Sequence, residues 1–224
     1  MKMIEVRNLT KKYRVGGDEI VAVDDVSLSI KKGEFVSILG HSGSGKTTLL
    51  SLIGGLTRPD TGTIVIDNTH IWLLSDDELS EFRNKKLNFI YQFSSLISTL
   101  NVLENVLLPT TFSKESDKNR IEYAIELLDM MGIKDKIYSY PSQLSGGQQR
   151  RAAIARAFIN NPEIILADEP TGDLDEETET EVMELFKKMN KDKGITFVMV
   201  THSTELARQC ERVFRMTKGK LIQE

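Results

Sequence analysis

This sequence of 224 residues has no excess of basic residues, a single cysteine and no long apolar run. Lys and Arg number 29 against 33 Asp and Glu, so the net charge is -4 and sequence-independent nucleic-acid binding is not expected. Cys210 is the only cysteine, which excludes an internal disulfide and fits a reducing compartment. No apolar run approaches the ~18 residues that cross a bilayer, and residues 1–10 lack a signal-peptide core. We therefore expect a soluble chain that would need other subunits for any membrane process.

Apolar residues follow two strand patterns. Alternation with polar residues at positions 26–30 and 64–66 is typical of half-buried antiparallel strands near the N-terminus. Continuous apolar runs at positions 35–39, 164–167 and 197–200 are typical of strands that are covered on both faces in a parallel sheet. We expect these three runs to be the central strands.

Helical spacing of apolar residues appears twice. The two stripes are Ile121, Ala124, Ile125 and Leu128, and Val182, Leu185, Phe186 and Met189. We interpret both as faces that pack into a core. Helices between apolar strands predict βαβ units and an α/β fold. Residues 93–161 show helical patterns without a central strand, so we expect them to form a helical insertion between parts 1–92 and 162–224 of a single domain.

A phosphate-binding loop is predicted directly after the run at 35–39. The sequence there matches G-x-x-x-x-G-K-S/T in full and leads into a helix-compatible stretch. Glycines let backbone N–H groups point at phosphate oxygens, and the helix N-terminus adds partial positive charge. Lys46 would reach the β- and γ-phosphates, and the Thr47 hydroxyl would bind Mg²⁺. A flexible Gly/Ser turn, the alternative, would not need Lys-Thr at its end. The expected nucleotide contacts are Gly40, His41, Ser42, Gly43, Ser44, Gly45, Lys46, Thr47 and Thr48.

Two adjacent carboxylates end the run at 164–167. A phosphate loop needs a carboxylate at the end of a neighbouring strand to hold Mg²⁺, and Asp168 is in that place. Adjacent carboxylates are costly unless a cation lies nearby. We interpret Asp168 as a metal ligand and Glu169 as the general base that polarises the attacking water. A solvated acidic turn before Pro170 is the alternative.

A third motif precedes a helix of small residues. Leu144 is followed by Ser145, Gly146, Gly147, Gln148 and Gln149. Alone, Ser-Gly-Gly could be an N-capped helix start. Together with the two nucleotide motifs, this LSGGQ sequence resembles the signature of the ABC-type ATPase family. The resemblance implies an ATP- and Mg²⁺-dependent ATPase with a P-loop parallel-sheet core, an N-terminal antiparallel β subdomain and an inserted α-helical subdomain.

The resemblance assigns roles to four further residues. It implies that Tyr13 stacks on adenine and that Gln92, which follows the strand expected at 87–91, senses Mg²⁺ and γ-phosphate. It implies that His202 contacts γ-phosphate and that Asp175, in the D-loop 173–175, lies between subunits. Without the resemblance, a strand tyrosine would pack and a histidine after a strand would be structural.

In this family the signature of one subunit closes over the nucleotide of the other. The resemblance therefore implies a head-to-tail homodimer with two composite sites, in which Ser145, Gly146, Gly147 and Gln148 act in trans. ATP would close the dimer and hydrolysis would loosen it.

Residues 87–93, 103–106 and 168–175 most resemble the LolD-like lipoprotein-releasing, MacB and FtsE branch. This implies integral membrane permease subunits (MacB, FtsX or LolC/LolE-like) as partners and a peripheral position on the cytoplasmic face of the membrane. The loop 93–100 exposes apolar residues amid serines and suits a docking site for a partner helix. The branch pattern is broken by serines at four positions, Ser94, Ser95, Ser98 and Ser203.

The sequence argues against three rival functions. ABC proteins of translation carry two cassettes, whereas this chain has one phosphate loop and one signature. DNA-repair ATPases insert a long coiled coil between the nucleotide motifs, for which this chain has no space. A binding module that does not hydrolyse ATP would not need Lys46, Asp168, Glu169 and His202 together.

Overall fold

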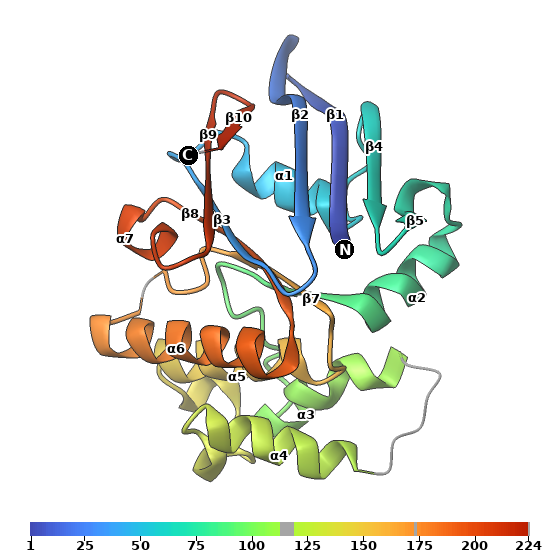
Figure 1. Cartoon of the computed structure of the whole chain (residues 1–224). Helices are drawn as coiled ribbons and strands as arrows, with labels where there is room; N and C mark the ends of the chain where they lie inside the picture. Colours follow the sequence, from blue (N-terminus) through green and yellow to red (C-terminus); the bar gives the residue numbers. More distant parts are fainter. Residues whose placement is uncertain (113–118, 173, 224) are drawn as a thin grey trace.

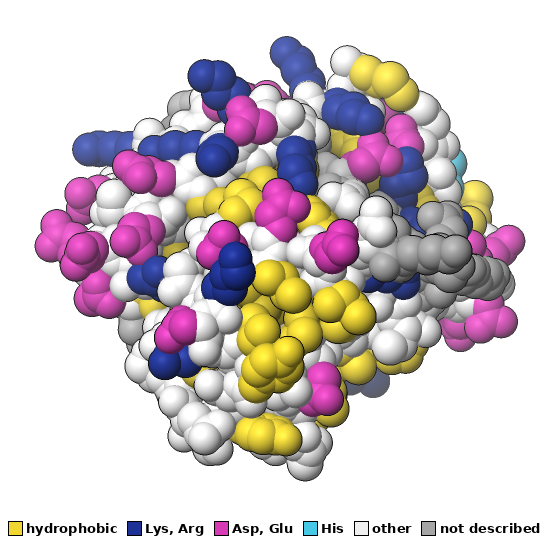
Figure 2. All heavy atoms as spheres, turned by 90° about the horizontal axis from the view of Figure 1, so that it is seen from below, with side chains coloured by type: hydrophobic (Ala, Val, Ile, Leu, Met, Phe, Trp, Pro, Cys, Tyr) yellow, Lys and Arg dark blue, Asp and Glu magenta, His cyan; other side chains and the backbone are white. Residues whose placement is uncertain are grey.

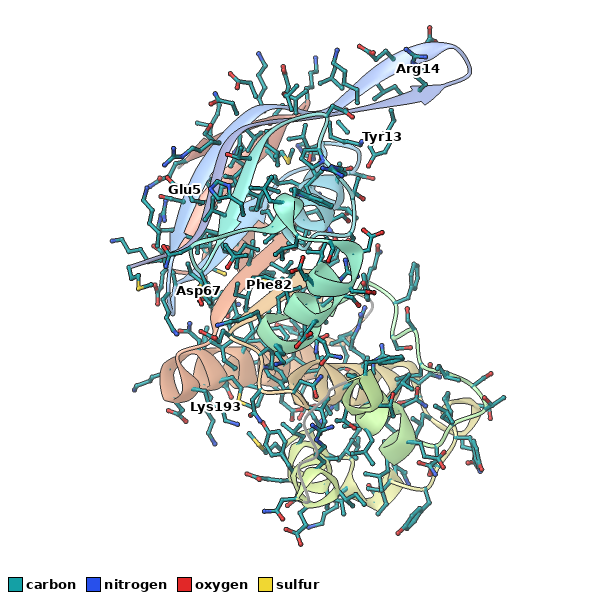
Figure 3. All side chains as sticks on the ribbon, turned by 90° about the vertical axis from the view of Figure 1, so that its right-hand side faces the viewer. Glu5, Tyr13, Arg14, Asp67, Phe82 and Lys193 are labelled. Carbon is teal, nitrogen blue, oxygen red and sulfur yellow. The ribbon has the colours of Figure 1, made fainter. Side chains whose placement is uncertain are left out.

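The computed structural model describes residues 1–112, 119–172 and 174–223, and its strands form two sheets (Figure 1). The antiparallel sheet has the order β2-β1-β4-β5, built from β1 (Lys2–Val15), β2 (Asp18–Lys31), β4 (Thr61–Ile66) and β5 (Thr69–His70). The predicted apolar positions of β2 and β4 are buried, which confirms the alternation: Val26, Leu28, Ile30, Ile64 and Ile66. The β1–β2 hairpin projects from the body, with Arg14 near its tip and Tyr13 closer in (Figure 3).

The second sheet carries the predicted central strands. Its order is β10-β9-β3-β8-β7-β6, with β3 (Phe35–Leu39), β8 (Thr196–Thr201) and β7 (Ile164–Asp168) in the middle. β9 (Arg212–Thr217) and β6 (Leu87–Ile90) flank them in parallel, and β10 (Lys220–Gln223) is antiparallel at the edge. Leu39 pairs with Thr201, and Val200 with Asp168. The segments that follow β3, β7 and β8 therefore meet at one edge of the sheet.

Helices cover both faces of this sheet. α1 (Lys46–Ile53) and the antiparallel sheet pack with α2 (Asp76–Lys86) and η1 (Ile71–Leu73) on one face. On the other face lie α5 (Gly146–Phe158) and α6 (Glu176–Lys193), where Phe158, Phe186 and Phe197 contact one another. The short α7 (Thr204–Ala207) precedes β9. Because side chains of the central strands enter a core on each side, the sheet edge is firmly placed.

The described residues between 93 and 161 form helices and no strand. These are α3 (Val102–Leu107), α4 (Arg120–Met130) and α5, with the short turns η2 (Leu108–Phe112), η3 (Lys134–Lys136) and η4 (Pro141–Gln143). The stripe predicted on α6 is correct, since Val182, Phe186 and Met189 are buried.

The stripe predicted on α4 is partly wrong. Ala124 and Leu128 are buried as predicted, but Ile121 is 56% exposed and the helix buries Leu127, which was not predicted. Because Leu127 is buried and Ile121 is not, the buried face is rotated about the helix axis from the predicted one. Figure 2 views the underside of Figure 1, the end at which α4 lies, and shows apolar side chains gathered among acidic and basic ones. No helix in the described ranges combines the length and the apolar character that a bilayer crossing requires.

Candidate functional site

The loop after β3 is wound so tightly that only glycine fits at its key positions. Gly45 has φ 106°, and a Cβ there would lie 2.1 Å from the Ala22 carbonyl oxygen. A Cβ on Gly40 would lie 2.5 Å from the Met216 carbonyl oxygen. The loop therefore fits between the β1–β2 hairpin and β9, and α1 begins at Lys46 with its N-terminus facing the loop.

Lys46 is the buried cation of this loop. It is 7% exposed, and its Nζ donates hydrogen bonds to the carbonyl oxygens of Gly40 at 2.7 Å and His41 at 3.1 Å. The hydroxyl of Ser44 is buried nearby without a partner among the described residues. A buried ammonium and an unsatisfied hydroxyl beside a helix N-terminus fit an anionic ligand with several oxygens, such as a triphosphate.

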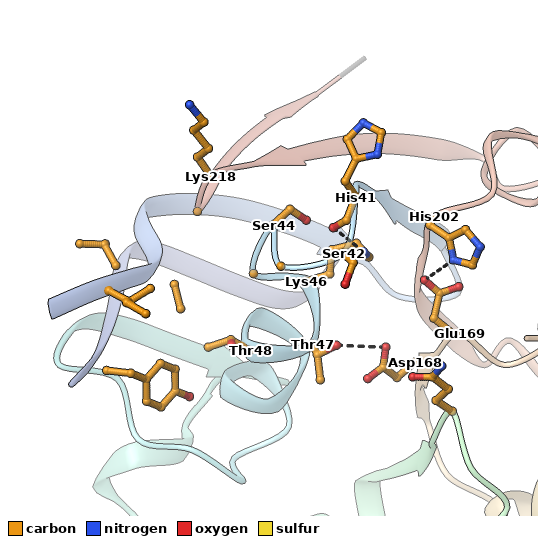
Figure 4. A pocket seen from close by; sticks show the side chains of 18 residues that line it. His41, Ser42, Ser44, Lys46, Thr47, Thr48, Asp168, Glu169, His202 and Lys218 are labelled. Atoms are coloured by element: carbon orange, nitrogen blue, oxygen red, sulfur yellow. Dashed lines mark hydrogen bonds and ion pairs between the residues drawn. The ribbon is translucent and has the colours of Figure 1, made fainter. Parts of the chain in front are cut away.

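The end of β7 brings the two carboxylates opposite this loop (Figure 4). Thr47 Oγ1 donates to Asp168 Oδ1 at 3.3 Å. Burial raises the pKa of Asp168, the charge of Glu169 adds to the rise, and Thr47 and Lys46 oppose it. A carboxylate whose charge is disfavoured by burial, next to a threonine hydroxyl, fits the hard oxygen ligands of Mg²⁺.

Glu169 is held by the residues that end β8. It has φ 45°, a left-handed conformation that is uncommon for a glutamate, and its N–H donates to the Val200 carbonyl. Thr201 Oγ1 donates to Glu169 Oε2 at 3.1 Å, and His202 Nδ1 lies 2.9 Å from Glu169 Oε1. The His202 side chain is 71% exposed, whereas that of Glu169 is 13% exposed. The two strand ends thus fix a carboxylate that faces the loop.

These groups line one cavity of about 810 Å³. Of the residues predicted from the sequence, it is lined by Tyr13, His41, Ser42, Gly43, Ser44, Gly45, Lys46, Thr47, Thr48, Gln92, Asp168, Glu169 and His202. Gln92 lies two residues beyond β6, further from the strand end than predicted. Lys46, Asp168, Glu169 and Gln92 together can hold a phosphate chain, a divalent cation and a water molecule.

Five lining residues were not predicted. Ile20, Val21 and Ala22 lie on β2 next to Tyr13, and Lys218 and Gly219 form the turn between β9 and β10. Ile20 and Val21 are exposed apolar residues on an otherwise charged hairpin, a weak signal that could have identified them. The turn at 218–219 carries no motif and is recognisable only in three dimensions, where the N–H of Gly219 donates to the Ser44 carbonyl.

The signature residues lie elsewhere in the chain. Ser145 caps α5, since its Oγ accepts from the Gln148 N–H at 3.3 Å, and Ser145 and Gly146 are exposed. None of Ser145, Gly146, Gly147 and Gln148 lines the 810 Å³ cavity. A smaller hollow of about 160 Å³ connects Gln92 with Gly146. Among the described residues that line these two spaces, Gln92 is the one that lines both.

The D-loop is described in part. Asp175 caps α6, accepting from the Thr178 N–H at 2.9 Å and from its hydroxyl at 2.8 Å, and both bonds lower the pKa of Asp175. Asp175 does not line the large cavity. Asp173 lies outside the described residues.

Ser203 has a local role. Its Oγ accepts from the Leu206 N–H and caps α7, and its N–H donates to Thr201 Oγ1 at 3.0 Å. The departure at this position leaves Thr201 and His202 in place beside Glu169.

Known proteins resemble the chain over its whole length. The family described as "ABC transporter" matches residues 23–172. The chain is 47% identical to the uncharacterised ABC transporter ATP-binding protein MJ0796 of Methanocaldococcus jannaschii, over 99% of this chain and 96% of that protein. A solved dimeric structure of MJ0796 in a post-hydrolysis state, bound to ADP and Pi, superposes with a TM-score of 0.93 at 45% identity, covering 99% and 98% of the two chains.

Two relatives are named for transport systems. The lipoprotein-releasing system ATP-binding protein LolD of Wigglesworthia glossinidia brevipalpis is 42% identical over 100% of this chain and 98% of its own length. The macrolide export ATP-binding/permease protein MacB of Rhodopirellula baltica is 41% identical over 99% of this chain, which corresponds to 33% of that longer protein.

Proposed function

The chain belongs to the ABC transporter family as an ATP-binding and ATP-hydrolysing subunit, and we propose that the 810 Å³ cavity is where it performs this reaction with Mg²⁺. The observation that carries the proposal is that Lys46, Asp168 and Glu169 meet in this one cavity although they come from distant parts of the sequence. The fold of the chain, a P-loop parallel-sheet core with an antiparallel β part and a helical part, is that of the MJ0796 cassette.

The phosphate chain of ATP would lie along the loop from Gly40 to Thr48. Backbone N–H groups, the N-terminus of α1 and the Lys46 ammonium supply positive charge where the phosphates carry negative charge. Thr47, Asp168 and Gln92 supply the oxygen atoms that Mg²⁺ would bind, and when bound, Mg²⁺ neutralises charge on the phosphate oxygens.

Glu169 would accept the proton of the attacking water. Thr201 and His202 hold its carboxylate, so it meets the water in a fixed orientation. His202 is exposed at the cavity rim and would extend a ring nitrogen toward γ-phosphate. Catalysis would then consist mainly of positioning and of charge stabilisation, as expected for phosphoryl transfer.

The site is completed by a second copy in this proposal. Ser145 and Gly146 are exposed at the start of α5 and lie outside the cavity of their own chain. Their N–H groups and hydroxyl suit a γ-phosphate that a second chain presents. The dimeric structure of MJ0796 supports a head-to-tail homodimer, with Asp175 near the subunit contact.

A membrane partner would dock beside the Gln92 loop. A groove of about 450 Å³ there is lined by apolar residues, among them Leu56, Tyr91 and Phe112, and by polar ones that include Arg83 and Arg156. Tyr91 and Phe112 are exposed, which suits the apolar face of a partner helix. The relatives LolD and MacB support a permease of the MacB, FtsX or LolC/LolE type at the cytoplasmic face.

The decisive experiment replaces Glu169 by glutamine. This variant keeps the shape of the site and removes the proton acceptor, so turnover should fall by roughly 10² or more while ATP binding survives. The variant should accumulate as an ATP-bound dimer in size exclusion with light scattering. A second substitution, Ser145→Arg, should abolish that dimer and leave ATP binding by the monomer intact. Wild-type turnover by Glu169→Gln, or a monomer at saturating ATP, contradicts the proposal.

A further inference from the structure

The loop after β6 carries Gln92 but has no regular structure of its own. Residues 91–95 lie between the end of β6 and α3, and Ser95 has φ 47°. A segment that makes no regular backbone hydrogen bonds keeps one conformation only if other groups donate hydrogen bonds to its carbonyl oxygens. Most of those groups are side chains of α5, the helix that begins at the signature.

Two arginines of α5 hold four of the loop carbonyls. Arg150 donates through Nη1 to the Tyr91 carbonyl and through Nη2 to the Gln92 carbonyl. Arg156 donates through Nη1 to the Ser95 carbonyl and through Nη2 to the Ser94 carbonyl, each at 2.9 Å. The planar guanidinium presents paired donors, so each arginine fixes two carbonyls at once.

Gln149 adds a connection to the signature itself. Its Oε1 accepts from Ser94 Oγ at 3.3 Å, while its Nε2 donates to the carbonyls of Pro141 at 2.9 Å and Leu144 at 3.4 Å. Gln149 and Arg156 are seven residues apart, two helical turns, and therefore lie on the same face of α5. That face lies against the Gln92 loop.

Burial of these two arginines costs free energy. Arg150 is 4% exposed, and burial lowers the pKa of Arg156. Burying a guanidinium is unfavourable unless it is well hydrogen-bonded, and an apolar residue would pack α5 more cheaply. Arg150 also donates to the Gly172 carbonyl at 3.4 Å, in the loop that follows Glu169. Its contacts thus join the neighbourhoods of Gln92, Glu169 and the signature.

We propose that Arg150 and Arg156 are positioning residues that fasten the Gln92 loop to the signature helix, so that Gln92 and the segment 145–148 move as one body. This inference rests on the proposed function, because it takes Gln92 as a ligand of the bound nucleotide and metal. Any shift of Gln92 in the cavity then shifts the signature by which the chain completes the site of a second copy.

The first test measures the fastening itself by hydrogen exchange on the purified chain. Lysine keeps the charge and loses the paired donors, so Arg150→Lys and Arg156→Lys should speed amide exchange in peptide 91–101 about tenfold or more, because the loop opens more often. Peptide 40–53 should exchange as in the wild type. Arg151→Lys is the matched control, because Arg151 lies on α5 but contacts Met131, Thr178 and Glu181 instead of the loop. Unchanged exchange in 91–101 overturns the proposal.

The second test measures the consequence for turnover. A misplacement of about 1 Å can cost roughly 10²-fold in rate, so kcat of Arg150→Lys should fall at least tenfold while ADP affinity stays near that of the wild type. Some thermal destabilisation is expected, because the buried lysine has fewer hydrogen bonds than the arginine, so kcat is measured at a temperature at which the variant is fully folded. In a Gln92→Ala background, Arg150→Lys should cause little further loss, because both changes remove one function. Fully multiplicative losses, or a kcat of the fully folded variant equal to that of the wild type, overturn the positioning role.

Two additions keep the result interpretable. If Arg150→Lys fails to fold by circular dichroism, Arg150→Gln retains an amide donor and takes its place in both tests. If the wild-type chain hydrolyses no ATP, the proposed function fails, whereas the exchange experiment still decides whether the arginines fasten the loop.

Discussion

Two irregular loops leave the same edge of the parallel sheet, and they are held in opposite ways. The side chain that holds the loop after β3 belongs to the loop's own segment, since Lys46 donates to the Gly40 and His41 carbonyls, and a backbone bond from Gly219 to Ser44 adds to this. The loop after β6 is held from a distance, by Arg150 and Arg156 of α5. A locally fixed loop offers a constant binding surface, whereas a loop fixed by another helix passes its movement to that helix. The first suits binding of the phosphates and the second suits transmission.

The largest effect is expected from the locally held loop. Lys46→Ala removes the one buried ammonium of the cavity, which the phosphates would need, so ATP binding or turnover should be severely lost. The fold should survive, because the glycines and the sheet still shape the loop. Turnover and nucleotide titration beside circular dichroism measure this.

The matched control for Lys46→Ala is Lys218→Ala, which removes a cation from the turn at the cavity rim. It should affect nucleotide affinity far less, because the phosphates lie along the β3 loop. Near-normal hydrolysis by Lys46→Ala would remove the basis of the comparison between the two loops.

A smaller loss is expected at the adenine side of the same cavity. Tyr13 lines the cavity next to Ile20 and Val21, whose apolar side chains have no hydrogen-bonding group to offer a base. Tyr13→Ala should weaken ATP and GTP alike, by about 1–3 kcal/mol, the usual strength of stacking on a base. Tyr13→Phe, the control, should bind both as the wild type does. A strong ATP preference that survives Tyr13→Ala would argue against this role.

A substitution in the loop after β6 should change how the membrane partner stimulates ATPase activity. Ile97 is 40% exposed, and its N–H and carbonyl are held by Asn105, so a change of side chain leaves the loop backbone in place. Ile97→Asp should reduce partner stimulation of ATPase activity several-fold and spare basal activity, because an apolar docking contact is lost.

Leu96 and Leu73 supply the contrasts for Ile97→Asp. Leu96 packs against the helical core, so Leu96→Asp should lower thermal stability instead. Leu73 is 83% exposed on η1, and Leu73→Asp should change neither property. Unchanged copurification of Ile97→Asp with a permease subunit, with full stimulation, would exclude this part of the loop from the docking site.

The same contrast explains what the sequence could predict. The strands β3, β7 and β8 are determined by consecutive residues, and the apolar runs at 35–39, 164–167 and 197–200 predicted them to within one residue at each end. The phosphate-binding role of the loop after β3 stays a prediction from its consecutive residues. The arginine contacts to the Gln92 loop depend on how α5 packs against β6, which no local pattern records. On α4, exposed and buried apolar residues differ little in kind, so periodicity alone chose Ile121 over Leu127. The cavity residues at 218–219 were missed because their turn carries no motif and reaches the cavity only in the folded chain.

The smallest expected effect concerns the stability of the nucleotide-free chain. Burial raises the pKa of Asp168, so the folded state disfavours its charge. This penalty is complete at pH values above the raised pKa. It disappears as the pH falls toward the ordinary value of about 3.9, where the carboxyl is protonated in both folded and unfolded chains. Asn at position 168 carries no charge at any pH and still accepts from Thr47. In EDTA at pH 7, Asp168→Asn should therefore raise the melting temperature by ~1–4 °C, and the gain should shrink as the pH falls through the raised pKa toward the ordinary value.

The pKa of Asp175 is shifted in the opposite direction, so Asp175→Asn serves as the control for Asp168→Asn. Hydrogen bonds from Thr178 lower the pKa of Asp175, so its charge favours the folded state above the ordinary pKa, and that contribution is lost as the pH falls through the lowered one. Asp175→Asn should thus leave the melting temperature at pH 7 unchanged or lower it. Asp168→Asn should also lose Mg²⁺-dependent hydrolysis, since the charge that destabilises the empty site is the one the cation would bind. A lower melting temperature for Asp168→Asn at pH 7 would show that Asp168 is stabilised by its surroundings, as an ordinary structural carboxylate is.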